Sequence, residues 1–214
     1  MKTYIYLNYT QSYSLPIIFQ SDDVRSSESL VKYFLKECTQ KGDIVFDPFA
    51  GYGTTLHVAE RMGRIPYGVE IDQEKVKFVR TKLDNKENII HGDSRNLDNI
   101  DLPKIDFSFT SPPYMTKENH PEYPFSGYKI TGEGYKEYLR DIQSIYNQLH
   151  TRMKPKGKVI VEVANLKVKN QVTTLAWDIG QEISKVMHFE GEVIICWDKN
   201  GFGYDHSYCL LFSN

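Results

Sequence analysis

Short apolar runs alternate along the chain with longer stretches in which apolar residues recur at helical spacing. The runs typical of strands are Asp43–Asp47, Ile65–Ile71, Asn88–Asp93, Ile105–Ser111 and Lys158–Asn165. Helical spacing is found at Ser26–Cys38, Thr54–Gly63, Gln73–Leu83, Tyr135–Met153 and Val172–Val186. This alternation predicts an α/β fold, with a mostly parallel sheet and helices on both of its faces.

The C-terminal part of the chain departs from this alternation. Glu192–Asp198 and Tyr204–Phe212 flank the turn sequence KNGFG and predict an antiparallel hairpin. There is no internal repeat and no low-complexity segment, so residues 1–214 are expected to form a single domain. Residues 1–42 form its N-terminal segment, and the irregular residues 115–134 follow the fourth predicted strand.

Composition narrows the class of protein without naming a function. The net charge of −2 gives no overall attraction to nucleic acid, so any such contact would need a local patch. The cysteines Cys38, Cys196 and Cys209 lack metal-ligand spacing, which predicts no metal site and a reduced, cytoplasmic protein. No apolar run resembles a signal peptide or approaches the about 20 residues of a membrane span.

The sequence DPFAGYGTT, Asp47–Thr55, lies between the first predicted strand and a helix. Gly51 and Gly53 permit tight turns and close approach of the backbone to a ligand. The third glycine of a dinucleotide fingerprint is missing, and no Lys-Ser/Thr pair follows as in a P-loop. Two more acids end the next strands: Glu70 could accept hydrogen bonds from ribose hydroxyls, and Asp93 from an adenine amino group.

Three acids at successive strand ends favour a particular kind of ligand. They would repel a pyrophosphate, but they suit an adenosine compound that carries positive charge. S-adenosylmethionine fits, since it has an amine and a sulfonium, and Asp47 would face the amine side. The alternative is that each acid only caps the following helix, and this is the interpretation we adopt for Asp72.

The fourth predicted strand ends in TSPPY. Pro112 and Pro113 stiffen the turn and offer carbonyls without N–H donors. The Ser111 hydroxyl and the Pro112 carbonyl could each accept one hydrogen of an exocyclic amino group. That grip would aim the nitrogen at a methyl donor, and Tyr114 would give a flat face for a base that has been flipped out.

DPFAGYGTT and TSPPY resemble the two signature motifs of the amino-group (N4-cytosine or N6-adenine) DNA methyltransferases. GVEID and HGDS resemble the motifs between them, and the resemblance spans Ser26 to Asn165. It implies a Rossmann-like class I methyltransferase fold with a seven-stranded sheet whose last strand is antiparallel, and S-adenosylmethionine as cofactor. A serine in the catalytic motif favours cytosine N4 as the target, whereas an aspartate favours adenine N6.

The resemblance also implies the roles of individual residues. The catalytic loop is Ser111, Pro112, Pro113 and Tyr114. The cofactor-binding residues are Asp47, Pro48, Phe49, Ala50, Gly51, Gly53, Thr54, Glu70, Ile71, Asp93, Ser94 and Thr110. The helix that opens at Arg25–Leu30 resembles the family's extra cofactor segment.

Restriction-modification members of this family usually carry a separate target-recognition region, and little of this chain is free to form one. Residues 115–134 are the candidate target loop, with substrate contacts from Tyr114, Lys117, Tyr123, Phe125 and Tyr128. The expected partner is therefore nucleic acid, with DNA favoured over RNA. The target could be recognised by this chain alone, with a separate recognition subunit, or with a second copy of the chain. Guanine-N2 methylation of RNA, methylation of a protein amide and a non-catalytic cofactor-binding subunit remain alternatives.

Overall fold

The computed structural model describes residues 2–117, 124–125, 134–201 and 204–214. Its main sheet has eight strands in the order β1-β9-β10-β6-β5-β2-β3-β4. Every neighbouring pair is parallel except those that β10 makes with β6 and β9. The strands are β1 (Tyr4–Leu7), β2 (Ile44–Asp47), β3 (Ile65–Glu70), β4 (Ile89–His91), β5 (Ile105–Thr110), β6 (Met153–Val163), β9 (His188–Gly201) and β10 (Tyr204–Ser213).

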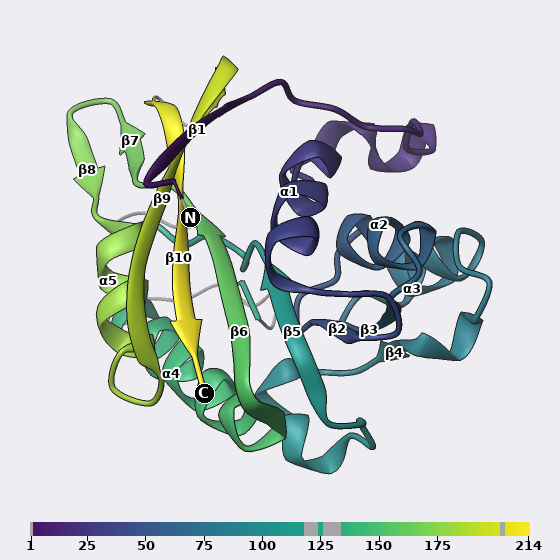
Figure 1. Cartoon of the computed structure of the whole chain (residues 1–214). Helices are drawn as coiled ribbons and strands as arrows, with labels where there is room; N and C mark the ends of the chain where they lie inside the picture. The colour runs from purple at the N-terminus through teal and green to yellow at the C-terminus, as the bar shows by residue number, and fades with distance from the viewer. Residues whose placement is uncertain (1, 118–123, 126–133, 202–203) are drawn as a thin grey trace.

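Helices cover both faces of this sheet, as Figure 1 shows. One face carries α1 (Glu28–Cys38), α2 (Thr54–Arg61) and α3 (Gln73–Arg80), and the other carries α4 (Gly134–Arg152) and α5 (Leu175–Ile183). Side chains alternate between the two layers, so that Phe107 and Phe109 pack with α1 while Val159 and Val161 pack with α4 and α5. Three of the described segments are short 3-10 helices: η1 (Ile17–Asp22), η2 (Lys86–Asn88) and η3 (Ser94–Asn99).

The predicted α/β fold, its strands and its terminal hairpin are confirmed, and two local predictions need correction. The sheet has an eighth strand, β1, which was not predicted. Only Ile5 of its four residues is buried, so its sequence lacks the apolar run that is typical of a strand. Val172 lies in β8 (Gln171–Thr173), which pairs with β7 (Leu166–Val168), and not on the fifth predicted helix. Its apolar side chain is exposed there and matched the helical spacing by coincidence.

The N-terminal segment crosses the sheet above the carboxyl ends of its parallel strands. In Figure 1 the purple chain leaves β1, passes over this edge to η1, and turns back into α1. Aromatic contacts fasten it there, because the Phe19 ring lies 5.3 Å from Tyr52 and 6.0 Å from Phe78. The segment therefore lies beside the loop that follows β2.

The packing between β3 and α2 leaves no room for a side chain at Gly68. A Cβ there would lie 2.9 Å from both methyls of the buried Leu56 and 3.0 Å from the Ala50 Cβ. We expect Gly68→Ala to lower the free energy of unfolding by about 1–3 kcal/mol, since overpacking shifts the backbone. Urea denaturation measures this value.

Gly180→Ala is the matched control for that substitution. Gly180 lies inside α5, and its added methyl would touch only one Leu210 carbon, at 3.4 Å. Alanine is the better helix former, so stability should stay level or rise by about 0.5–1 kcal/mol. Equal losses at both glycines would contradict the packing argument.

Candidate functional site

The carboxyl ends of β2, β3, β4 and β5 are neighbours at one edge of the sheet. The sequence places Asp47, Glu70 and Thr110 at the last positions of β2, β3 and β5, and Asp93 just beyond β4. Parallel order thus brings together residues that are up to 63 positions apart in the chain. Most of the residues expected to bind a cofactor gather at this edge.

The loop between β2 and α2 depends on glycine at two positions. Gly51 has φ +53° and Gly53 has φ +79°, a backbone region that other residues rarely adopt. A Cβ on Gly53 would lie 2.7 Å from Val79 of α3, so this glycine lets the loop pack closely. A Cβ on Gly51 would meet only the Phe49 carbonyl, at 3.9 Å, which leaves open space beside the backbone where a ligand could lie.

Asp47 is buried beneath this loop rather than exposed to a ligand. Its Oδ1 accepts a hydrogen bond from the Thr110 hydroxyl at 2.6 Å and another from the Phe49 amide at 2.9 Å. Burial raises the pKa of Asp47 to about 6, although the bond from Thr110 opposes this shift. The pair joins the end of β2 to the end of β5, directly before Ser111.

Glu70 shapes the same loop from β3. Its Oε2 accepts from the Gly51 amide and its Oε1 from the Asp72 amide, both at 2.8 Å. A carboxylate has about four acceptor positions, so capacity remains for two further donors such as ribose hydroxyls. Beside it, Ile71 leaves 46% of its surface exposed, which offers an apolar face next to the acid.

The acid after β4 is already engaged. Asp93 caps η3 through the Arg95 amide and forms an ion pair with the Arg95 guanidinium at 2.6 Å. The neighbouring Ser94 hydroxyl is buried and donates to the Pro48 carbonyl. Both residues lie at the expected edge, where Ser94 holds the loop and an adenine amine would have to compete with Arg95 for Asp93.

The TSPPY turn is fixed by hydrogen bonds on both of its sides. The Tyr114 hydroxyl oxygen accepts from the Ala164 amide at 3.0 Å, and a side-chain hydrogen bond joins it to Ser111. The Pro113 carbonyl accepts from the Tyr138 hydroxyl at 2.9 Å. Pro112 is buried, and its carbonyl accepts no hydrogen bond from the described residues.

The described residues among those predicted to contact a substrate lie in different parts of the structure. Phe125 is buried in a ring stack, 5.6 Å from Phe49 and 5.3 Å from Tyr138. Lys117 reaches α5 instead of the sheet edge. Tyr123 and Tyr128 lie outside the described residues.

Sequence reasoning missed a buried acid, Glu162, near the end of β6. Only 8% of this residue is exposed, and its Oε2 has no hydrogen-bond partner. Burial raises the pKa of Glu162 to about 7, which a hydrogen bond from Ser26 only partly opposes. Burial also raises the pKa of Tyr114, and the charge of Glu162 raises it further. An acid inside the apolar run KVIVEVAN was the available signal.

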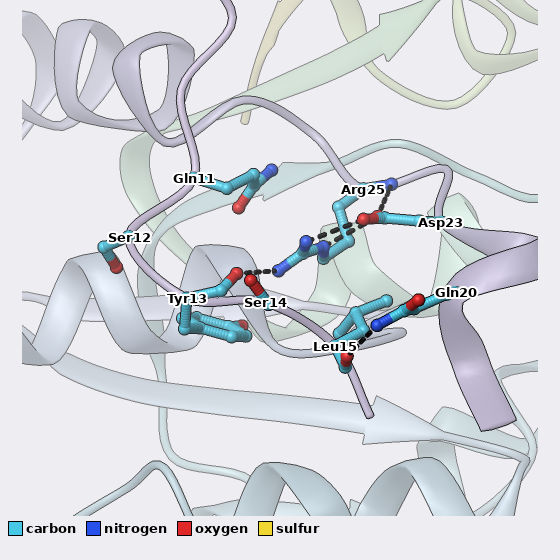
Figure 2. Close-up of a pocket in the computed structure, with 8 residues that line it drawn as sticks. All are labelled: Gln11, Ser12, Tyr13, Ser14, Leu15, Gln20, Asp23 and Arg25. Atoms are coloured by element: carbon cyan, nitrogen blue, oxygen red, sulfur yellow. Dashed lines mark hydrogen bonds and ion pairs between the residues drawn. The ribbon is translucent and has the colours of Figure 1, made fainter. Parts of the chain in front are cut away.

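A polar cavity of about 430 Å³ that is open to solvent was also missed, and residues of the N-terminal segment line it. Figure 2 shows the Arg25 guanidinium held between the Asp23 carboxylate, at 2.7 Å, and the Tyr13 carbonyl, at 3.2 Å. The Tyr13 hydroxyl donates to the Tyr52 carbonyl at 2.9 Å. The cavity therefore lies beside the glycine loop, and a cation lines it.

Across residues 2–117, 124–125, 134–201 and 204–214, no three His, Cys, Asp or Glu side chains come together as metal ligands would. Within these ranges, none of the helices has the length and apolar character to cross a membrane.

The raised pKa of Glu162 predicts that the free energy of unfolding falls as the pH rises. Its pKa rises from 4.5 in the unfolded chain to about 7, so its favourable contribution is complete below pH 4.5 and disappears as pH rises through 7. Glu162→Gln should therefore be more stable than the wild type at pH 8, by on the order of 1–3 kcal/mol, and equal to it near pH 4.5. Urea denaturation at both pH values tests this.

The exposed Glu192 of β9 provides the control, as Glu192→Gln should give the same small change at both pH values. A Glu162→Gln effect that did not vary with pH would contradict the assignment of a buried, titrating carboxyl.

Known proteins resemble this chain at the level of sequence over one region. A family model described as DNA methylase matches residues 23–81. The type II methyltransferase M2.DpnII of Streptococcus pneumoniae is 39% identical over 57 residues, which cover 27% of this chain and 21% of that protein. The DNA adenine methyltransferase YhdJ of Escherichia coli is 38% identical over 66 residues, covering 31% and 22%. The matched region thus spans about a fifth of these relatives.

Solved structures resemble the chain over nearly its whole length. TrmN from Thermus thermophilus gives a TM-score of 0.65 at 14% identity, over 92% of this chain and 52% of its own. The 16S rRNA methyltransferase RsmC, solved with AdoMet and guanosine, gives 0.57 at 18% identity, over 92% and 45%. A methyltransferase from Clostridium acetobutylicum gives 0.60 at 12%, over 92% and 96%. The chain thus resembles DNA methylases in sequence over residues 23–81, and over nearly its whole length it has the fold of the class I, S-adenosylmethionine-dependent methyltransferases.

Proposed function

We propose that this protein transfers a methyl group from S-adenosylmethionine to an exocyclic amino group of a DNA base, with cytosine N4 as the first candidate. One observation carries the proposal: the 2.6 Å bond between Asp47 and Thr110 joins the glycine loop to the strand that leads directly into Ser111. A cofactor on the loop and a base at TSPPY would then be neighbours.

The residues present fit the cofactor at three points. Glu70 retains acceptor capacity for the ribose, and the exposed Ile71 beside it could pack against the adenine. Gly51 leaves room for close backbone approach. At the cavity, the carboxylate end of the methionine would have to compete with Asp23 for the Arg25 guanidinium, which is the kind of partner that carboxylates prefer. Asp47 supports the loop from below.

The cofactor, when bound, supplies an electrophilic methyl group on a positively charged sulfur. The protein's task is to hold the target nitrogen in line with it. Ser111 and the Pro112 carbonyl accept the two amine hydrogens, which draws electron density onto the nitrogen. Transfer would join the nitrogen to the methyl carbon as the carbon–sulfur bond breaks, would leave the electron pair on sulfur, and would release the proton of the nitrogen to solvent water. The Ala164 amide holds the Tyr114 hydroxyl, and the partly buried Tyr114 ring would have to turn one face to the base.

We favour DNA over RNA as the substrate because of the sequence similarity to DNA methyltransferases. The proteins that match in sequence are DNA methyltransferases, whereas the rRNA enzyme RsmC matches in fold at 18% identity. The serine at position 111 favours cytosine within the amino-group family. RNA and adenine are therefore treated as outcomes of the substrate experiment.

The cofactor assignment predicts that Glu70→Ala weakens S-adenosylmethionine binding at least tenfold, because two ribose acceptors and the support of Gly51 are lost together. Isothermal titration calorimetry measures the dissociation constant. Glu74 is an exposed acid on α3 that pairs with Lys77, so Glu74→Ala should leave that dissociation constant within twofold of the wild-type value. No heat of binding to the wild type would remove the cofactor from the proposal.

The chemical assignment predicts that Ser111→Ala lowers kcat for methyl transfer about a hundredfold while cofactor affinity stays within threefold. Tritiated methyl transfer to cytosine-, adenine- and RNA-containing substrates, followed by nucleoside identification, provides the measurement. Ser184→Ala, at the exposed end of α5, is the matched control.

Each outcome of that assay bears on a separate part of the proposal. N4-methylcytosine supports it fully. N6-methyladenine or a methylated RNA base would replace the substrate and keep the mechanism. Tight cofactor binding without transfer to any pool would favour a non-catalytic subunit.

A further inference from the structure

A small hairpin follows the carboxyl end of β6. Its strands β7 and β8 form a two-stranded sheet of their own, paired from Leu166↔Thr173 to Val168↔Gln171. This register leaves Lys169 and Asn170 as the turn between them. In Figure 1 the light-green pair rises above α5, outside the main sheet. The hairpin is therefore an addition to the eight-stranded fold.

The segment that contains the TSPPY turn holds the base of this hairpin on both sides. Ahead of β7, the Ala164 amide donates to the Tyr114 hydroxyl at 3.0 Å. At the end of β8, the Thr173 hydroxyl accepts from the Lys117 amide at 3.1 Å. Leu166 and Thr173, which pair across the two strands, are both buried. The hairpin is thus fixed beside the proposed catalytic turn, and its other end projects from there.

The next pair of residues along the hairpin lies on its exposed face, because side chains alternate along a strand. Lys167 is exposed and lies opposite Val172, which is 50% exposed. Lys169 is exposed at the turn. Neither Lys167 nor Lys169 makes a side-chain hydrogen bond or an ion pair with the described residues, whereas Lys117 is paired with Asp178. Two ammonium groups on this face thus have no described counter-charge.

The hairpin is basic although the whole chain is slightly acidic. The net charge of the chain is −2, but residues 163–177 contain two lysines and no acid. Positive charge at the surface of a nucleic-acid enzyme favours contact with phosphates, which position the substrate and supply much of its affinity. The charge of the hairpin therefore complements the backbone of the substrate expected at the adjoining turn.

We propose that the β7–β8 hairpin contacts the phosphate backbone of the nucleic-acid substrate through Lys167 and Lys169, an inference that rests on the proposed function. The simpler role is protective, because lysines on the open edges of a small sheet prevent pairing with other chains. The two roles differ in what they predict. Protection predicts self-association when the lysines are removed, whereas phosphate contact predicts weaker and less salt-dependent binding.

Fluorescence anisotropy with a labelled DNA duplex of about 20 base pairs, from about 50 to about 200 mM salt, tests the contact. Lys167→Gln and Lys169→Asn should each lower the slope of log affinity against log salt by about 1, and the double variant by about 2. At about 100 mM salt we expect the double variant to bind about tenfold more weakly than the wild type. In the methyl-transfer assay its KM for DNA should rise by a similar factor, with kcat within twofold.

Lys156→Asn is the matched control for Lys169→Asn. Both lysines are exposed and have a left-handed backbone, with φ +66° at Lys156 and +54° at Lys169. Lys156 lies near the start of β6, at the opposite end of that strand from the hairpin. Asparagine adopts this backbone more readily than lysine, so both substitutions should change the free energy of unfolding alike. Only Lys169→Asn should change the salt dependence of binding.

Val172→Lys tests the same surface by adding a charge. The new ammonium would lie beside Lys167 on the exposed face, so the salt slope should increase by about 1 and affinity should rise severalfold. Val172→Gln, which adds polarity without charge, should leave the slope at the wild-type value.

The outcomes separate this inference from the proposed function. A wild-type slope in the double variant, or an equal decrease in Lys156→Asn, would overturn the phosphate contact. Self-association of the double variant in sedimentation, with an unchanged slope, would establish edge protection instead. The same titration with single-stranded DNA and RNA shows which backbone the hairpin contacts. If the hairpin variants lost affinity but the wild type transferred no methyl group, the proposed function would fail and the contact would stand.

Discussion

The site depends on one buried hydrogen bond, between the Thr110 hydroxyl and the Asp47 carboxylate. Both side chains are buried, Asp47 with 4% and Thr110 with 0% of its surface exposed, so each needs a hydrogen-bond partner inside the protein. Their 2.6 Å contact fixes the end of β5 relative to the end of β2. The glycine loop starts at one of these ends and TSPPY at the other. Loss of either partner would leave a buried group unsatisfied and would loosen both loops together.

The remaining contacts around the loop show that acids can serve structure and binding at once. Glu70 supports Gly51 through one oxygen and the start of α3 through the other, and it still has acceptor capacity to spare. Asp93 already uses much of its hydrogen-bond-accepting capacity on Arg95. A loop held in this way is formed before any ligand arrives, which lowers the entropy lost on binding. Glu162 adds a buried carboxyl beside Tyr114 that has no such partner at Oε2.

The sequence alone determined the architecture, because alternating apolar runs and helical spacing depend on local chemistry that each segment carries with it. It also placed the glycine loop, Glu70 and Ser111 at strand ends, and parallel order then required those ends to meet. Strand β1 could not be foreseen, since Tyr4 and Tyr6 are exposed and only its pairing with β9 makes it a strand.

Only the tertiary structure decided how each polar group is used. The sequence could not tell that Asp47 would lie beneath the loop, or that the Tyr114 hydroxyl would be held by the backbone amide of Ala164, just after β6. Nor could it show that Lys117 and Tyr135 share Asp178, which follows them by more than forty residues. Hydrogen-bond partners depend on distance in space, and spacing along the chain fixes that distance only within a helix, strand or turn.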